Sequence, residues 1–400
     1  MSSGIFPRRL KYAEIVPLLK KGDKKELSNY RPVSFLTAFS KVFEEIIYVR
    51  LCQLLINRSV FLNEQFGLKA KSSTAKAIFN LINEILEALI SKKVVGGIFY
   101  NLEKAFDSVN HDILLCKLNF YGIRGPFYKL IKSYLTNRYQ RVLIGAKAYY
   151  HSSYLEWGKI NHGIPQGSIL GPFRFLFYIN DLLKIVEYNS KPTLFAYDTS
   201  FSLIPITQTL KPILIMFFQL NKWLDDNLLF LNYERTQYVH FTLKGTGLHE
   251  APIGYNNNFI SNSTSTKFLA VIIENTLSWK AHIDHLLPKL SACYGVRTIK
   301  PFMCQENLKS VYYSCFHSLM THGIIFWGNS THSIYVFRLQ KRVTRIITDS
   351  RPTDSCRQLF KKLGILPLML QYIFPLLLCI VSNEALFQMN FEIHSINTKV

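Results

Sequence analysis

The chain has 400 residues, of which 48% are hydrophobic and 14% aromatic, enough for a globular protein of two or three domains with a substantial core. Lys and Arg outnumber Asp and Glu by 47 to 26, and the resulting charge of +21 favours a polyanionic partner, with nucleic acid ahead of an anionic membrane surface. Seven scattered cysteines without a C-x-x-C pair argue against a disulfide framework and a zinc module, and the N-terminus lacks the apolar core of a secretory signal. We therefore expect an intracellular protein, nuclear or cytoplasmic, that is not secreted.

A basic loop follows the first strand pattern, which begins at Glu14. Lysines flank a Gly-Asp turn there, and Pro32 favours an extended conformation at Arg31, from which a forked guanidinium can bind phosphate. The loop could reach a triphosphate or a template backbone, and a solvated charged loop is the alternative. Two amphipathic packing helices are expected next, one with Ser40 as its N-cap and one after residues 63–74.

The apolar run Val94–Tyr100 predicts a buried strand. The position just past the end of this strand would hold a metal-binding carboxylate rigidly, but Asn101 stands there. Helices are expected after it, around residues 113–120 and 127–135.

The segment Gly163–Pro172 contains three glycines and two prolines. This combination gives the backbone freedom at some points and rigidity at others, which suits a loop that closely approaches a flat ligand. The following helix, Phe173–Leu183, is apolar on nearly every side and is expected to be buried.

The stretch Leu194–Ile204 predicts a β-hairpin with a carboxylate, Asp198, at its tip. Two short acids on one rigid turn can supply hard oxygen ligands to Mg²⁺. Only one acid is present, because Tyr197 occupies the neighbouring position. An Asp in a turn that only bonds the local backbone is the alternative.

The remaining elements are a helix to about Asp226, strands near residues 238–241 and 267–273, and helices from Ser278 onwards. In the helix 336–347 we expect Val336, Leu339, Val343 and Ile346 on one face and Arg338, Lys341, Arg342 and Arg345 on another. The basic face could lie along a phosphate backbone, or it could simply be solvated.

The run Leu363–Val381 has about the length of a membrane span. Pro367, Gln371 and Pro375 interrupt it, so a buried terminal helix pair is favoured and no membrane partner is expected.

Several strings occur in a telling order: Pro17–Asp23, Ser28–Ser34, Gln65–Gly67 with Ser73-Thr74, Leu102–Asp107, Gly163–Pro172, Tyr178–Leu182, Lys267–Leu269, Trp327-Gly328, Leu339–Arg342 and Leu363–Leu368. Together they resemble the reverse transcriptase of non-LTR, jockey-like retrotransposons from about residue 4 to about residue 370. The resemblance implies an α+β right-hand polymerase with fingers, an antiparallel-sheet palm and a helical thumb. We expect partial fingers in 1–93, the palm with the nucleotide and metal site in 94–285, and a helical thumb and C-terminal region in 286–400.

The resemblance also implies an activity and partners. The activity is that of an RNA-directed DNA polymerase, which uses an RNA template, a DNA primer, deoxynucleoside triphosphates and two Mg²⁺ ions. Because the chain starts inside the fingers, we expect cutting of target DNA to need another protein.

Site residues are carried over by motif. Asn101, Tyr197 and Asp198 take the places of three metal-binding aspartates, and Phe106 resembles the residue that packs under the sugar. The other nucleotide-binding positions are Lys20, Arg31, Gln166 and Arg235, where the last stands for a usual Lys. Phe268 and Leu269 resemble the primer grip, whose usual final Gly is Ala270.

Two of the three metal-binding acids are therefore replaced. Asparagine offers only a neutral carbonyl, and a tyrosine phenol stays protonated near neutral pH. We expect a catalytically impaired copy, with a non-catalytic RNA- or DNA-binding protein as the alternative and residual activity with Mn²⁺ as a further one.

Overall fold

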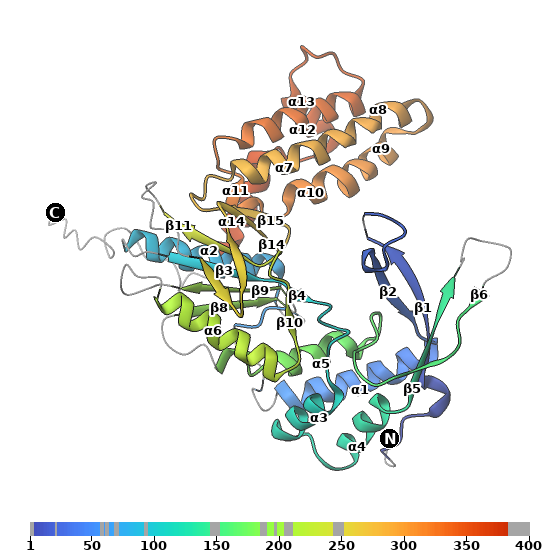
Figure 1. Cartoon of the computed structure of the whole chain (residues 1–400). Coiled ribbons are helices and arrows are strands. Elements are labelled where there is room, and N and C mark those ends of the chain that lie inside the picture. Colours follow the sequence, from blue (N-terminus) through green and yellow to red (C-terminus); the bar gives the residue numbers. More distant parts are fainter. Residues whose placement is uncertain are drawn as a thin grey trace. The chain divides into compact units, whose positions relative to one another are not determined.

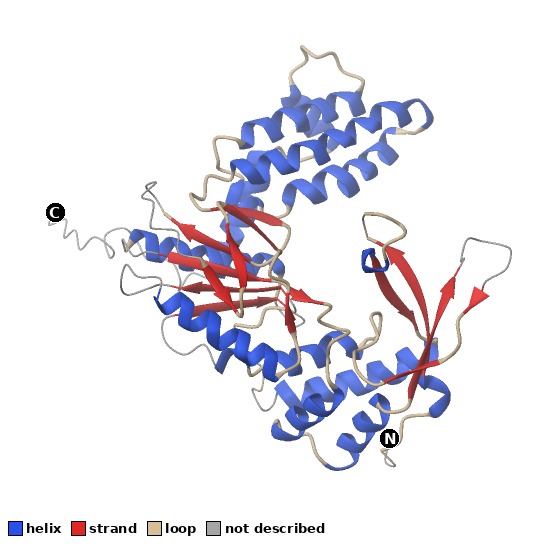
Figure 2. Ribbon diagram, viewed as in Figure 1, coloured by secondary structure: helices blue, strands red, loops and turns tan. Residues whose placement is uncertain are grey.

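The structure is a computed structural model that describes residues 4–20, 22–56, 60, 64–67, 72–91, 95–144, 153–184, 190–195, 198–203, 211–242 and 252–382. The chain forms two compact units, Met1–Ser263 and Thr264–Val400. The first unit mixes helices with sheets and the second is largely helical, which confirms the α+β class (Figure 1, Figure 2). The division at residues 93 and 285 stays a prediction.

The first unit contains a five-stranded sheet in the order β2-β1-β5-β6, with β7 also paired to β5. Its strands are β1 (Tyr12–Leu19), β2 (Tyr30–Phe35), β5 (Arg138–Ile144), β6 (Ser153–Tyr154) and β7 (Gly158–Ile160). β1 and β5 run parallel, and the other pairs are antiparallel. Alternate residues such as Ala13, Ile15 and Ser34 are buried, so one face of this sheet covers the core and the other is open.

A six-stranded sheet forms the centre of the first unit, in the order β12-β13-β11-β3-β9-β8. Its strands are β3 (Val95–Tyr100), β8 (Ser190–Phe195), β9 (Asp198–Leu203), β11 (Gln237–Phe241), β12 (Ile253–Tyr255) and β13 (Asn258–Asn262). All neighbouring pairs are antiparallel except β11 with β13. All six residues of β3 are buried, as its apolar sequence predicts. Two short strands, β4 (Leu102–Glu103) and β10 (Phe230–Leu231), pair beside it.

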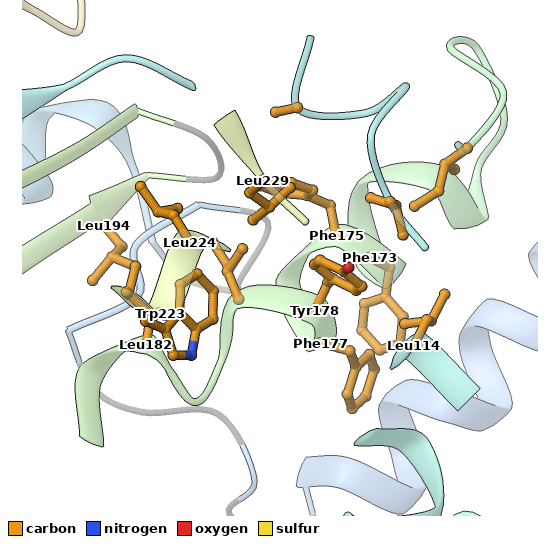
Figure 3. Close-up of a cluster of buried hydrophobic side chains, with 14 of the residues drawn as sticks. Leu114, Phe173, Phe175, Phe177, Tyr178, Leu182, Leu194, Trp223, Leu224 and Leu229 are labelled. Atoms are coloured by element: carbon orange, nitrogen blue, oxygen red, sulfur yellow. The ribbon is translucent and has the colours of Figure 1, made fainter. Parts of the chain in front are cut away.

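The helices of the first unit are α1 (Ala38–Ile56), α2 (Thr74–Ile90), α3 (His111–Phe120), α4 (Gly125–Leu135), α5 (Leu170–Ile179) and α6 (Lys211–Asp226). Helices α2 and α6 contact strands of the six-stranded sheet, whereas α1 packs on α5, and α3 packs on α4 and α5. Figure 3 shows aromatic residues of α5 packed against Leu114 of α3 in the buried core. Phe175 and Phe177 are fully buried, which confirms the expected burial of this helix.

Helix α1 begins earlier than its sequence pattern indicated. Ser40 is buried inside the helix, and its backbone N–H donates to the hydroxyl of Thr37 at 3.2 Å. Thr37 therefore has the capping role that we expected of Ser40. Two hydroxyl residues three positions apart are equivalent candidates in the sequence, and only the backbone geometry separates them.

The second unit opens with a hairpin of β14 (Ser265–Phe268) and β15 (Val271–Glu274). Its helices are α7 (Lys280–Ser291), α8 (Val296–Ile299), α9 (Gln305–Val311), the π-helical turn Tyr312–His317, α10 (Ser318–Thr321), α11 (Ile324–Trp327), α12 (Ser333–Thr348), α13 (Cys356–Leu363) and α14 (Leu368–Ser382). The single strand expected over residues 267–273 was wrong, because the chain reverses at Leu269 and Ala270, both with positive φ. The sequence has no Gly or Asn there to signal the turn.

Helix α14 is not buried as expected. Phe374 and Leu378 are 58% and 52% exposed, so the helix pair exists but its second member keeps much of its apolar surface. Among the described helices, none is by itself both long and apolar enough to cross a membrane, whereas α13 and α14 taken together, bent by 55°, meet the length and composition required.

Candidate functional site

The register of the central sheet brings two of the expected metal positions together. Tyr100 of β3 pairs with Thr199 of β9, so the next step of the ladder sets Asn101 opposite Asp198. Asp198 in turn pairs with Phe195 across the β8–β9 hairpin, which confirms the predicted hairpin. Tyr197 lies outside the described residues. The end of β3 and the start of β9, almost 100 residues apart in the chain, thus meet where we expect the metal site.

Hydrogen bonds fix the backbone of Asn101. Its N–H donates to the hydroxyl of Thr236 at 3.2 Å, and its carbonyl accepts from the N–H of Asn232 at 2.8 Å. The Thr236 hydroxyl donates to the Asn232 carbonyl at 2.8 Å, which closes the turn between them. Arg235 lies in this turn and is exposed, so the bonds of Thr236 and Asn232 bring its backbone close to Asn101 in space, although the two residues are far apart in the sequence.

A second group forms around the glycine-containing loop. The Gln166 side-chain amide donates to Asp107 at 3.0 Å, and the Ile164 N–H donates to the carbonyl of Phe106 at 2.8 Å. The Phe106 ring packs on Phe175 with centroids 5.3 Å apart. Phe106 and Gln166 are thus held on adjoining turns, and their role in binding a nucleotide stays a prediction.

The same loop is also bonded to the five-stranded sheet. The N–H of Ser34 in β2 donates to the Gln166 carbonyl at 2.7 Å. Gly167 has a φ of +112°, and a Cβ there would lie 2.8 Å from the Ser34 carbonyl oxygen. Glycine is needed at this position because the loop approaches protein backbone closely, and the expected approach of the loop to a flat ligand stays a prediction.

Lys20 and Arg31 lie on one hairpin. Arg31 pairs with Leu18, and the N–H of Lys20 donates to the Asn29 carbonyl at 2.9 Å. Lys20 follows Leu18 by two residues, so its side chain and that of Arg31 project from the same face, and both are exposed. Strand β2 connects them to Gln166 through Ser34.

A buried histidine, His111, is hydrogen-bonded to the glycine-containing loop. The Nε2–H of His111 donates to the carbonyl of Gly163 at 2.7 Å. Burial lowers the pKa of His111 below its usual value, although the hydrogen bond to Gly163 partly opposes this shift. The ring therefore stays uncharged near neutral pH and acts as a positioning group.

The predicted primer-grip residues belong to the second unit. Phe268 is buried at the end of β14, and Leu269 forms the following turn. The Nε2–H of His322 donates to the Leu269 carbonyl at 2.9 Å, so a residue of the helical part of this unit holds the turn.

The basic residues of α12 each contact a neighbour in their own unit. Arg338 lies over Tyr335, Lys341 over Phe337 and Arg342 over Tyr294, at 5.5, 4.6 and 4.6 Å from the ring centroids. The side chain of Arg345 donates to the carbonyl of Asp354 at 2.9 Å. Arg338 and Arg342 remain exposed, so these two offer free N–H groups to a phosphate.

The buried face of α12 differs from the predicted one. Gln340 and Thr344 are fully buried, whereas Leu339 and Ile346 are only partly so. The Gln340 amide donates to the Tyr312 hydroxyl at 2.9 Å and accepts from the Leu368 N–H at 2.8 Å. These bonds offset the burial of a polar side chain, and hydrophobic spacing could not reveal them.

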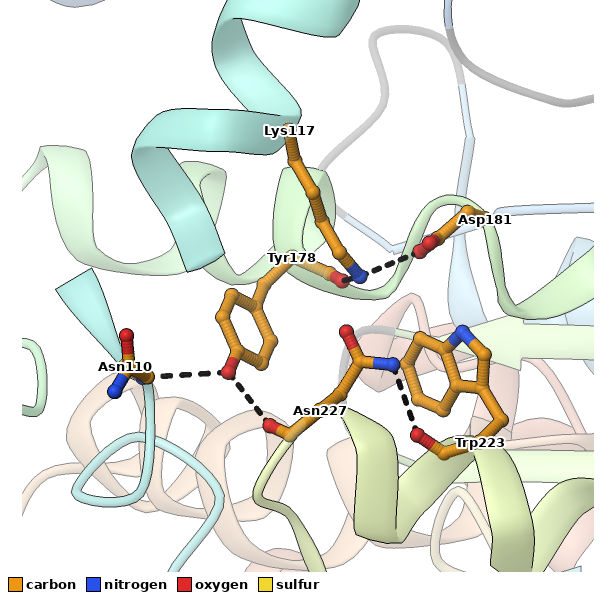
Figure 4. Close-up of polar contacts among 6 residues, drawn as sticks. All are labelled: Asn110, Lys117, Tyr178, Asp181, Trp223 and Asn227. Atoms are coloured by element: carbon orange, nitrogen blue, oxygen red, sulfur yellow. Dashed lines mark hydrogen bonds and ion pairs between the residues drawn. The ribbon is translucent and has the colours of Figure 1, made fainter. Parts of the chain in front are cut away.

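The structure also shows polar residues that motif reasoning left without a role. Lys117 donates to Asp181 at 2.7 Å and to the Tyr178 carbonyl at 2.6 Å, while the Tyr178 hydroxyl donates to the Asn227 carbonyl at 2.6 Å (Figure 4). Tyr178 and Asp181 belong to the motif Tyr178–Leu182, which contributes to the family resemblance. This motif was the signal in the sequence that could have pointed to them. In the part of the chain that the structure describes, no three His, Cys, Asp or Glu side chains group closely enough to hold a metal ion.

The sequence of the chain is similar to those of known reverse transcriptases. Residues 19–273 match the family described as "Reverse transcriptase (RNA-dependent DNA polymerase)". The chain is 27% identical over 359 residues to a probable RNA-directed DNA polymerase from transposon BS of Drosophila melanogaster, covering 86% of this chain and 39% of that protein. It is also 27% identical to the RNA-directed DNA polymerase from mobile element jockey of the same species, covering 80% and 36%. The chain therefore spans about two fifths of the length of these curated relatives.

Among solved structures, apo telomerase from Candida tropicalis is similar with a TM-score of 0.49 at 12% identity, over 90% of this chain and 60% of that one. Telomerase from Candida albicans with a fragment of telomeric RNA gives 0.48 at 10% identity, over 90% and 66%.

Proposed function

Since the chain belongs to the reverse transcriptase (RNA-dependent DNA polymerase) family and has its right-hand polymerase fold, we propose that it binds an RNA template and a DNA primer but extends the primer at a negligible rate. The observation that carries this proposal is the β3–β9 register, which sets Asn101 opposite Asp198. The position next to the remaining acid in this sheet is thus occupied by an uncharged residue.

Members of this family need divalent metal, and the donor set here does not fit two such ions. Two dications need several negatively charged oxygens at 2.0–2.1 Å, and Asp198 supplies the one carboxylate among the three carried-over positions. Asn101 and Tyr197 are uncharged near neutral pH. Loss of residues that act as one catalytic unit costs roughly ten-thousand- to million-fold in rate.

The nucleotide- and strand-binding groups support retained binding. Lys20 and Arg31 are exposed on one hairpin face, and Gln166 is held beside Phe106. The charge of +21 supplies the general attraction for a polyanion. These features also favour the second candidate function, a nucleic-acid-binding protein without chemistry.

The decisive experiment is primer extension on an RNA template with Mg²⁺. We expect no extension by the natural chain and measurable extension by the double variant Asn101→Asp with Tyr197→Asp, because the variant regains two acids and then has all three. Adding Asp198→Asn to that double variant should abolish extension again. A repeat with Mn²⁺ tests for residual activity, since this ion tolerates poorer ligand sets.

Two results would contradict the proposal. Extension by the natural chain at the rate of the double variant would show that the acids were misassigned. Failure of the folded double variant, while it still binds template and primer, would favour the binding protein without chemistry.

A further inference from the structure

Helix α1 of the first unit is apolar on two opposite sides. Ile47 and Leu51 belong to the buried core, at 1% and 2% exposure, on the side where the helix packs on α5. A surface helix normally has polar residues on the side away from its core. That side of α1 instead carries four apolar residues that are 74%, 57%, 43% and 43% exposed, which we call the outer stripe: Phe39, Val42, Ile46 and Val49.

The outer stripe has the spacing of a coiled-coil seam. Its residues follow one another after three, four and three positions, which is the alternation of the a and d positions in a heptad repeat. Phe39 and Ile46 take the a positions, and Val42 and Val49 take the d positions. Side chains with this spacing insert between those of a second helix, and a β-branched residue such as Ile46 at position a favours a pair of helices. The partner that fits the outer stripe is therefore one other helix.

Two charged residues border the outer stripe. Glu45 stands at a g position and Arg50 at the following e position of the heptad. Both side chains are exposed, and among the described residues neither has an ion-pair partner. In a parallel pair of helices, a g residue lies beside the e residue that is five positions further along the other helix. Glu45 and Arg50 are five positions apart, so two parallel copies of α1 bring acid and base together twice.

The same charges disfavour other arrangements and other partners. In an antiparallel pair the g positions of the two helices face each other, so centred pairing sets Glu45 against Glu45 of the second copy. Nucleic acid binds a basic border, and Glu45 repels its phosphates. The headgroups of an anionic membrane are repelled in the same way. The apolar stripe and its borders together select a parallel copy of α1.

We propose that α1 binds α1 of a second copy of this chain, parallel to it about a two-fold axis. The two outer stripes form the buried seam, and Glu45 of each copy pairs with Arg50 of the other. The charge of +21 on each copy opposes pairing only close to the contact, because the Debye length is about 8 Å at physiological salt. A seam of about three helical turns is a small interface, so we expect a dissociation constant on the order of 10 μM. This inference does not depend on the proposed function.

Sedimentation velocity of the nuclease-treated chain measures the pairing. We expect the natural chain to change from monomer to dimer as its concentration rises from about 1 to about 100 μM. Ile46→Lys should keep the chain monomeric, because it places a charge in the middle of the seam. The substituted side chain is exposed in the single copy, so circular dichroism should show an unchanged fold. The control is Ile90→Lys on α2, where the isoleucine is 77% exposed, and this variant should dimerise as the natural chain does.

Charge reversal tests the direction of the second helix. Glu45→Arg and Arg50→Glu should each weaken the dimer roughly 5- to 30-fold, because like charges then meet at both borders of the seam. The two substitutions in one chain should restore the natural affinity, since acid and base only exchange places. In an antiparallel pair, Glu45→Arg would leave the affinity unchanged, because like charges meet before and after the substitution.

Several results would overturn this inference. A natural chain that stays monomeric at about 100 μM lacks the interface. A dimer that Ile46→Lys leaves intact uses another surface, and a combined charge variant that does not regain affinity rules out the parallel pair. A monomeric chain that binds vesicles of phosphatidylcholine and phosphatidylserine, and loses this binding in Ile46→Lys, would assign the outer stripe to a membrane surface instead.

Discussion

At the scale of single residues, the turn of the β14–β15 hairpin is held in an unfavourable backbone conformation. Leu269 and Ala270 have φ values of +46° and +68°, the left-handed region that both positions of a type I′ turn require. A side chain with a Cβ costs about 1–2 kcal/mol there relative to the right-handed region. The His322 bond to the Leu269 carbonyl helps to keep the turn closed.

We expect Ala270→Gly to stabilise the second unit by roughly 1 kcal/mol, because glycine adopts this conformation without steric cost. Slower hydrogen exchange of the β14 and β15 amides would measure the gain. The control is Ala281→Gly in α7, which should destabilise by about the same amount, since glycine is unfavourable in a helix. Faster exchange of the hairpin amides in Ala270→Gly would show that the positive φ of Ala270 does not destabilise the turn.

At the scale of elements, one buried carboxylate joins three helices of the first unit. Glu44 of α1 is fully buried, accepts from the Tyr134 hydroxyl of α4 at 2.5 Å and accepts from the Ile169 N–H before α5 at 2.8 Å. The guanidinium groups of Arg138 and Arg174 lie over the Tyr134 ring, at 4.3 and 3.8 Å from its centroid. Burial lowers the pKa of Arg174, and interactions with Tyr134 and Glu44 oppose this shift.

Removing that charge should be costly. We expect Glu44→Gln to lower the free energy of unfolding by about 3 kcal/mol, because the buried Arg174 guanidinium then lacks the counter-charge of Glu44. Urea unfolding measures the change. The neighbouring Glu45 is exposed, so Glu45→Gln should change stability by less than about 0.5 kcal/mol. If Glu44→Gln and Glu45→Gln changed the free energy of unfolding equally, the contacts of Glu44 would not be what stabilises the packing of these helices.

At the scale of the whole molecule, charge governs the association with nucleic acid. The excess of 21 positive charges predicts binding whose affinity falls steeply as salt rises, because each phosphate contact releases a counterion. Arg342 of α12 is exposed and offers one such contact.

We expect Arg342→Ala to reduce the slope of log affinity against log salt by about 1, with the same loss for every RNA sequence tested. Filter binding over a salt series measures the slope. Lys76→Ala on α2 removes an exposed charge of the same sign and serves as the control. A natural chain with a shallow slope would argue against nucleic-acid binding, and an unchanged slope in Arg342→Ala would remove α12 from the contact surface.

Local patterns in the chain were sufficient for the family, the α+β class and much of the secondary structure. The apolar run before Asn101 forms β3, the residues around Asp198 form a hairpin, and the all-apolar α5 is buried. Each of these elements is determined by residues that are close together in the sequence. The motifs that identify the family are also short segments of consecutive residues.

Other features depended on partners far along the chain. Three such features are the pairing of β3 with β9, the bonds of Glu44 to α4 and α5, and the burial of Gln340 in α12. Each joins segments that no periodicity in the sequence relates. The reversal at Ala270 and the exposure of α14 were mispredicted for the same reason, because turn conformation and burial are set by what packs against a segment. Amino-acid order thus establishes which chemical groups are available, and long-range packing establishes which of them meet, since contact energies depend on neighbours in space.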